Sequence, residues 1–236
     1  MEKLEILYED EFFVIVQKPV GILMHRTKMS EDKISLMQLL RDQLGYRVYT
    51  VHRLDRATSG IVLFGKKQSS ANELSALFRK QSIDKKYLAI LRGWVPDKGV
   101  IDYNLSDQET GRIVPQQAVT HYLCLGRSVI DAAIGLRYPT ARFSLVSVVP
   151  LTGRRHQIRK HFAHLRHPVI GDKRHGDVKQ NKYFSEEFGL NRMFLHALEL
   201  SFNHPFFEKE LKIHCPPDEH FIKGIEVSGL KEHYLI

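Results

Sequence analysis

The order of predicted secondary structure is the strongest constraint on the fold of this 236-residue chain. Short apolar runs typical of strands follow one another, and few helical patterns separate them. Parallel strands need a crossover, usually a helix, so this order disfavours a doubly wound sheet. It predicts an α+β fold in which helices flank a mixed, mostly antiparallel sheet. Strands are expected over residues 4–8, 12–16, 47–51, 60–64, 86–94, 100–105, 118–125, 128–134, 141–149, 193–202 and 210–214.

Apolar residues at helical spacing are the second pattern. They predict helices over residues 34–44, 69–81, 154–165 and 218–226. The polar segment 106–117 and the segment 167–183, rich in glycine and charge, are expected to be irregular, and residues 227–236 show no pattern. Neither an internal repeat nor a low-complexity linker marks a boundary, so residues 1–236 are expected to form one domain.

The stretch HRLDRATSG, residues 52–60, is the strongest candidate for a chemical role. Arg53 and Arg56 flank Asp55, and a nearby positive charge favours the ionised form of a carboxyl group. An ionised aspartate can act as a nucleophile or a base without a metal. The alternative is a salt-bridged loop between two strands, because surface ion pairs are common and weak.

The positive charge of the chain is concentrated in one segment. The formal net charge is +8, and residues 152–182 carry nine Lys and Arg against two Asp, a net charge of +7. Such a concentration is expected for a partner that is a polyanion, although a solvated basic face is the alternative. A membrane surface is a poorer partner, because no long amphipathic basic helix accompanies the charge.

Several other classes are disfavoured. The N-terminal residues MEKLEILYEDEFF lack the apolar run of a signal peptide, and no stretch has the ~18 apolar residues of a membrane-spanning helix. Two cysteines, Cys124 and Cys215, cannot build a disulfide framework, and we expect them reduced and buried in a cytoplasmic protein. The histidines between His156 and His175 lack the usual zinc-binding partners, so no metal site is expected.

Several motifs, in the same order along the chain, resemble those of the RluA-type pseudouridine synthase family. HRLDRATSG resembles the catalytic motif of that family. The resemblance extends over residues 4–215 and includes Lys18–Gly21 (KPVG), Lys86–Tyr87, Ala118–Tyr122 (AVTHY), Leu151–Arg159 (LTGRRHQIR) and Pro168–Asp172 (PVIGD).

The resemblance implies the isomerisation of a uridine in RNA to pseudouridine, on a catalytic domain with a central basic cleft. It implies that Asp55 is the nucleophile, that Arg159 pairs with Asp55 and keeps it ionised, and that Tyr87 stacks on the target base. Whether Asp55 attacks uracil or ribose, or stabilises an elimination intermediate, stays open. No cofactor is expected. Ile158 is expected to pack against the same base.

The resemblance also implies how RNA is held. The target uridine must leave its stack, and Arg53 is the candidate to fill the vacated space. His52 is expected to orient the loop or contact a phosphate. No S4-type RNA-binding domain is expected, so the catalytic domain itself should contact RNA. A monomer is expected, because nothing in the sequence signals an interface. The backbone contacts are expected from Arg154, Arg155, His156 and Lys160.

The substrate and even the activity leave alternatives open. Residues 154–177 are most similar to the subgroup that modifies uridine 65 of tRNA. Ribosomal RNA, or both RNAs, are alternative substrates. A catalytically silent RNA-binding protein and a metal-dependent nucleic-acid hydrolase are alternatives from other classes.

Overall fold

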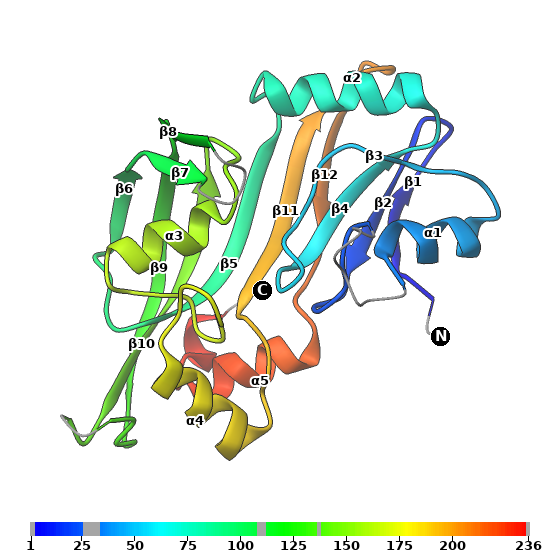
Figure 1. Ribbon diagram of the computed structural model, residues 1–236. Helices are drawn as coiled ribbons and strands as arrows, with labels where there is room; N and C mark the ends of the chain where they lie inside the picture. Colours follow the sequence, from blue (N-terminus) through cyan, green and yellow to red (C-terminus); the bar gives the residue numbers. More distant parts are fainter. Residues whose placement is uncertain (1–2, 26–33, 108–111, 136–137, 235–236) are drawn as a thin grey trace. The chain divides into compact units, whose positions relative to one another are not determined.

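The computed structural model describes residues 3–25, 34–107, 112–135 and 138–234 (Figure 1). Contacts between Cα atoms divide the chain into two compact units, which are described separately. The first unit comprises Met1–Lys85 and His196–Pro216, and the second comprises Lys86–Leu195 and Pro217–Ile236. The expectation of a single domain stays a prediction. In the described parts of the chain, no helix is both long enough and apolar enough to cross a membrane.

The first unit is built on an antiparallel meander with one parallel addition. Its strands lie in the order β1-β2-β4-β11-β12, with β3 beside β4; β4 and β11 run parallel, and the other neighbours are antiparallel. The elements are β1 (Ile6–Glu9), β2 (Phe13–Lys18), α1 (Leu36–Leu44), β3 (Tyr49–Thr50), β4 (Ser59–Gly65), α2 (Gln68–Arg79), β11 (Leu195–Asn203) and β12 (Glu210–His214).

The core of the first unit forms where β2, β4 and β11 meet α2. Phe13, Ile61, Leu74 and Phe202 are buried in one cluster, and α2 packs against β4. Burial of all seven residues of β4 explains its continuous apolar run over residues 61–64, because both faces of the strand are covered. This burial fixes the strand that immediately follows the HRLD loop.

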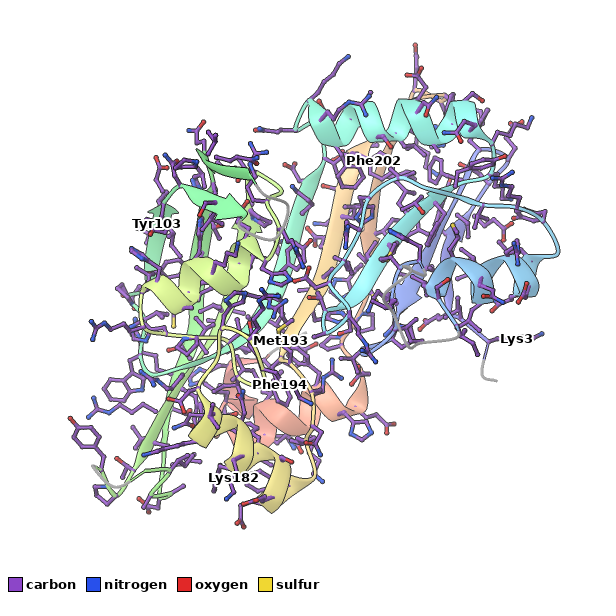
Figure 2. All side chains as sticks on the ribbon, viewed as in Figure 1. Lys3, Tyr103, Lys182, Met193, Phe194 and Phe202 are labelled. Carbon is purple, nitrogen blue, oxygen red and sulfur yellow. The ribbon has the colours of Figure 1, made fainter. Side chains whose placement is uncertain are left out.

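The second unit contains a four-stranded antiparallel sheet in the order β5-β10-β9-β6, and β7 and β8 form a separate hairpin. A row of aromatic side chains, Phe143, Phe184, Phe194 and Phe221, joins the sheet to the helices (Figure 2 labels Phe194). The elements are β5 (Asp84–Arg92), β6 (Lys98–Asp102), β7 (Leu105–Asp107), β8 (Arg112–Gln116), β9 (Val119–Ile130), β10 (Ala141–Pro150), α3 (Gln157–His164), α4 (Val178–Phe188), α5 (Glu219–Val227) and a 3-10 turn (Lys231–His233).

The predicted α+β class and the mostly antiparallel sheet are confirmed, but several local predictions are wrong. In place of the strands predicted over 118–125 and 128–134 there is one strand, β9, which ends at Ile130 and whose pairing with β10 shifts register once. The expected irregular segments contain the β7–β8 hairpin and α4. Asp177 caps α4 by accepting hydrogen bonds from Lys179 N and Gln180 N at 2.9 and 3.1 Å.

The basic helix α3 begins at Gln157, three residues later than predicted. The preceding residue, His156, has φ +55°, a left-handed conformation that a helix interior does not allow. Arg154 and Arg155 therefore lie in a turn and not on the helix. The cysteines differ in a smaller way: Cys215 is buried as expected, whereas Cys124 is half-buried.

Candidate active site

The buried ammonium group of Lys18 holds the loop that carries Asp55. Lys18, the last residue of β2, has no exposed surface, and β2–β4 pairing places it opposite Gly60. Its Nζ donates to the carbonyl oxygens of Arg56 and Thr58 at 3.0 and 2.8 Å, and to that of Pro19 at 2.9 Å. A buried charge is costly unless polar groups surround it, so these contacts fix the loop backbone on the C-terminal side of Asp55.

A second set of contacts ties the same loop to the turn after β2. Gly21 N donates to the carbonyl oxygen of Arg56, and Arg56 Nε donates back to that of Gly21, both at 2.9 Å. Thr58 N donates to the carbonyl oxygen of Asp55 at 3.1 Å and closes a tight turn. Asp55 is half-buried and Arg53 is exposed. One of the two guanidiniums flanking Asp55 thus anchors the loop.

His52 is a structural part of the loop. Its Nε2 accepts a hydrogen bond from Leu63 N at 3.0 Å, and its ring stacks on Phe78 with centroids 4.4 Å apart. Burial and then the nearby positive charge of Lys85 lower the pKa of His52 to about 3. A neutral ring whose Nε2 is already an acceptor is suited to orienting the loop, and poorly suited to pairing with a phosphate.

At the exit from the loop, Ser59 contacts a buried histidine of β11 that sequence analysis did not single out. His196 Nε2 donates to the carbonyl oxygen of Cys215 at 2.8 Å, because a carbonyl can only accept. Its Nδ1 lies 2.9 Å from Ser59 Oγ and can accept the hydroxyl proton. The two residues are opposite each other in the β4–β11 register. A lone His in a strand carries no sequence signal that would predict this pairing.

Tyr87 lies on β5 in the second unit, paired with Val148 of β10. Its side chain is half-buried, while the following residues Leu88–Ile90 are buried. The predicted strand position of this tyrosine is confirmed. Pairing of β5 with β10 fixes the backbone position of Tyr87. A ring that stacks on a base requires such a fixed position.

The turn before α3 is held by the amide of Gln157. Its Oε1 accepts from Arg154 N at 3.0 Å and from Thr152 Oγ1 at 2.7 Å. Its Nε2 donates to the carbonyl oxygen of Val119 and to Thr120 Oγ1, both at 2.9 Å. One buried side chain thus connects the turn, the helix and β9, and sets where α3 starts.

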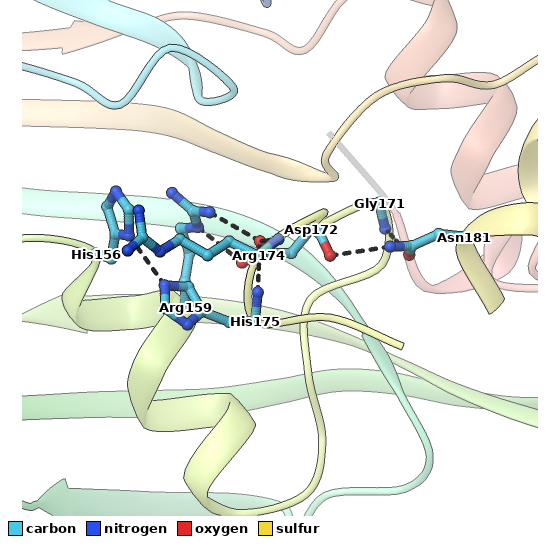
Figure 3. Close-up of polar contacts among 7 residues, drawn as sticks. All are labelled: His156, Arg159, Gly171, Asp172, Arg174, His175 and Asn181. Atoms are coloured by element: carbon cyan, nitrogen blue, oxygen red, sulfur yellow. Dashed lines mark hydrogen bonds and ion pairs between the residues drawn. The ribbon is translucent and has the colours of Figure 1, made fainter. Parts of the chain in front are cut away.

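Arg159 makes a bidentate, buried ion pair with Asp172 (Figure 3). Its Nε and a terminal nitrogen donate to the two carboxylate oxygens at 2.7 and 2.8 Å. Burial alone would raise the pKa of Asp172, but the pair with Arg159 and the backbone N–H groups of His175 and Arg174 outweigh it and lower that pKa. Asp172 therefore fixes the plane of the Arg159 guanidinium. The predicted pairing of Arg159 with Asp55 stays a prediction.

A pair of histidines lies beside this ion pair. His156 Nδ1 and His175 Nε2 share a hydrogen bond of 2.9 Å (Figure 3). Burial is the main cause that lowers the pKa of His175 to about 4, so its ring is neutral near pH 7. Among the described residues, no group of three or more His, Cys, Asp and Glu is arranged to hold a metal ion.

The remaining predicted RNA contacts lie around α3. Arg154 and Arg155 are exposed, and Arg154 Nε donates to the carbonyl oxygen of Gln117 at 3.0 Å. Lys160 Nζ donates to that of Ser106 at 3.1 Å. Ile158 is buried, with 6 % of its surface exposed. The structure thus places the basic residues at the surface of the second unit and Ile158 inside it.

Comparison with known proteins supplies the family. The sequence model of RNA pseudouridylate synthase matches residues 12–164, which include Asp55, Tyr87 and Arg159. The chain is 44 % identical over 237 residues to tRNA pseudouridine synthase C of Salmonella typhimurium strain LT2, covering 96 % of this chain and 90 % of that protein. It is 40 % identical to the protein of the same name from Vibrio cholerae, covering 99 % of each.

Solved structures share the fold of this chain. Human RNA pseudouridylate synthase domain containing 1 superposes with a TM-score of 0.72 at 26 % identity, covering 92 % of this chain and 84 % of that one. Human RNA pseudouridylate synthase domain containing 4 has the same fold, with a TM-score of 0.74 over 95 % of this chain and 93 % of that one. The family match, the relatives and the anchored Asp55 loop lead to one conclusion: this chain belongs to the RNA pseudouridylate synthase family.

Proposed function

We propose that this protein is a tRNA pseudouridine synthase that converts uridine 65 of tRNA to pseudouridine. The observation that carries the proposal is the 40–44 % identity, over nearly the whole chain, to enzymes named tRNA pseudouridine synthase C. The net charge of +8 supports a polyanionic substrate.

The reaction breaks the bond between C1′ of the ribose and N1 of uracil, and forms a bond between C1′ and C5. Reactants and product are isomers, so the chemistry requires no oxidant, reductant or group donor. Asp55 is the nucleophile, held at the surface of a loop whose backbone is tied to Lys18 and Gly21. A preorganised loop lowers the entropic cost of aligning the carboxylate with its target.

The target base is held by residues of the second unit. Tyr87 stacks on it, and Ile158 gives it an apolar neighbour. Arg159 is the proposed partner of the Asp55 carboxylate, and its own orientation comes from Asp172. Arg53, which is exposed, enters the space that the flipped uridine leaves, because a guanidinium can stack as well as pair.

The test is pseudouridine mapping after incubation of RNA with the purified protein, in parallel with and without EDTA. Substrates are unmodified tRNA and ribosomal RNA, and Asp55→Asn is the control. We expect pseudouridine at position 65 of tRNA with the wild type. We expect the rate to fall at least about a thousandfold in Asp55→Asn, with RNA affinity within about twofold of the wild type, since the nucleophile is removed but phosphate contacts remain.

Other outcomes distinguish the alternatives. Modification of ribosomal RNA alone would replace the tRNA assignment. Equal rates for the wild type and Asp55→Asn would refute the role of Asp55. RNA binding without any pseudouridine in either RNA would favour the binding protein, and activity lost only in EDTA would favour a metal-dependent enzyme.

A further inference from the structure

A pocket of about 460 Å³ lies in the second unit, outside the residues assigned to the uridine. It is bounded by α3, by residues 103–106, which run from the end of β6 into β7, and by the loop that carries Arg174. Its volume is in the range of pockets that bind small molecules or single nucleotides. The pocket therefore has room for a ligand the size of a single nucleotide.

Hydrogen bonds hold two walls of this pocket together. His161 Nε2 donates to the carbonyl oxygen of Tyr103 at 3.0 Å, and Lys160 Nζ donates to that of Ser106 at 3.1 Å. His161 Nδ1 also lies 2.9 Å from Thr120 Oγ1 on β9. The wall formed by residues 103–106 is thus fixed to α3 before any ligand binds, which lowers the entropic cost of binding.

The lining is cationic. Arg155, Lys160 and Arg174 lie around the pocket, and none of its described lining residues is Asp or Glu. Both arginines are exposed to solvent. Guanidinium groups bind phosphate oxygens through paired N–H donors, so the charge and the chemistry both favour a phosphate.

An aromatic pair completes the lining. Tyr103 (labelled in Figure 2) and His164 stack with ring centroids 3.8 Å apart and an interplanar angle of 18°. Tyr103 is nevertheless 44 % exposed, and His164 is exposed. Proteins that bind unpaired RNA combine cations for the backbone with aromatic rings for the bases. Phosphate alone does not stack on aromatic rings, so the exposed aromatic pair favours a ligand that also contains a base.

We propose that this pocket binds one unpaired nucleotide of the substrate RNA, separate from the uridine that is modified. Arg155 and Arg174 bind its phosphate, and its base stacks on Tyr103. This inference rests on the proposed function and adds to it a second contact point. A nucleotide in this pocket would help to select RNA with a loop or a bulge at a set distance from the target.

The experiment measures the affinity of each variant for unmodified tRNA and for a blunt, fully paired RNA duplex over a range of salt concentrations. Arg155→Gln/Arg174→Gln should bind both RNAs more weakly, with a salt slope smaller by about 0.7 for each phosphate that the variant no longer neutralises. Tyr103→Leu should bind tRNA about tenfold more weakly with an unchanged slope, and should bind the duplex like the wild type, because only an unpaired base can stack there.

Matched controls separate this site from general surface effects. Arg41→Gln/Arg79→Gln removes two exposed arginines from α1 and α2, and Tyr138→Leu removes a tyrosine that is 61 % exposed. The tyrosine control should keep wild-type affinity for both RNAs, and the arginine control should change affinity less than the pocket double variant. His164→Ala is a second test of the stack should Tyr103→Leu unfold, as judged by thermal melting.

Three results would overturn the inference. Pocket variants that bind both RNAs no worse than their controls would show that the pocket does not contact RNA. An effect of the arginines without an effect of Tyr103 or His164 would leave a phosphate contact and no nucleotide site. Tight binding of inorganic phosphate that Arg155→Gln/Arg174→Gln abolishes, with tRNA binding unchanged, would indicate a small-anion site. In each case, pseudouridine formation by the wild type would show that the proposed function still holds.

Discussion

Lys18 takes no part in the reaction, but its substitution is expected to lower both the stability of the protein and the rate of pseudouridine formation. Lys18→Met keeps the length of the side chain but leaves the carbonyl oxygens of Arg56 and Thr58 without this donor. We expect the free energy of unfolding to fall by about 2–3 kcal/mol, because these carbonyl groups lose their hydrogen bonds to a buried charged donor. Denaturant unfolding measures this change. The rate of pseudouridine formation should fall further than RNA affinity does.

The control for this prediction is Lys80→Met, which changes an exposed lysine at the end of α2. Its stability and rate should stay close to those of the wild type. If Lys18→Met retained the wild-type rate, the ammonium would not be what orders the Asp55 loop.

The lowered pKa of His52 is expected to make the free energy of unfolding depend on pH. Its pKa is about 3 in the folded protein and near 6.5 in the unfolded chain, so the unfolded chain binds the proton first as the pH falls. The contribution of His52 to stability is therefore fully present above pH 6.5 and is lost between pH 6.5 and about 3. The slope from this residue alone approaches about 1.4 kcal/mol per pH unit.

The measurement is the free energy of unfolding of the wild type and of His52→Gln between pH 4 and 8. Glutamine can still accept from Leu63 N, but it does not titrate. The difference between the two proteins should shrink or reverse as the pH falls below 6.5. Parallel curves over the whole range would rule out a neutral, buried His52.

At the scale of elements, the parallel contact between β4 and β11 depends on a glycine. Gly60 has φ +108°, and a Cβ at this position would lie 2.2 Å from the carbonyl oxygen of Ala197. Gly60→Ala should cost about 3 kcal/mol or more, because the backbone of β11 cannot give way cheaply. Gly21 has φ +88° but open space around it, so Gly21→Ala should cost only about 1 kcal/mol.

Thermal and denaturant unfolding of the two variants give this comparison. Equal losses of stability would mean that backbone conformation, and not the close approach to Ala197, determines the cost. Gly60→Ala should also disturb the candidate site, because Gly60 is the next residue after Ser59, whose hydroxyl is hydrogen-bonded to His196.

At the scale of the whole molecule, the uneven charge predicts the salt dependence of RNA binding. Residues 152–182 carry a net charge of +7, out of +8 for the chain. Arg155→Glu/Lys160→Glu should weaken RNA binding and reduce its salt slope, because fewer counterions are released. The check is a filter-binding or fluorescence titration at several salt concentrations. An unchanged slope would exclude this segment from the RNA contact surface.

Local patterns predicted several elements correctly. The helix predicted over 218–226 is α5, which Asp218 caps by accepting from Phe221 N. The strands predicted over 193–202 and 210–214 are β11 and β12, which pair with each other. The β7–β8 hairpin was missed because its strands are short and polar and contain Pro115, so they do not alternate clearly. Helix α4 was missed although Asp177 and Gly189 were available as its start and stop signals.

The sequence by itself determined the fold class, most elements, the family motifs and the excess of positive charge, since each depends on residue type and on spacing over a few residues. Only the tertiary structure revealed what orients the motifs. Lys18 reaches Thr58 across 40 residues, Ser59 meets His196 across 137, and Arg159 is oriented by Asp172 across a loop. Such partners are set by strand pairing and by the burial of polar groups that must be satisfied, and no local pattern records them.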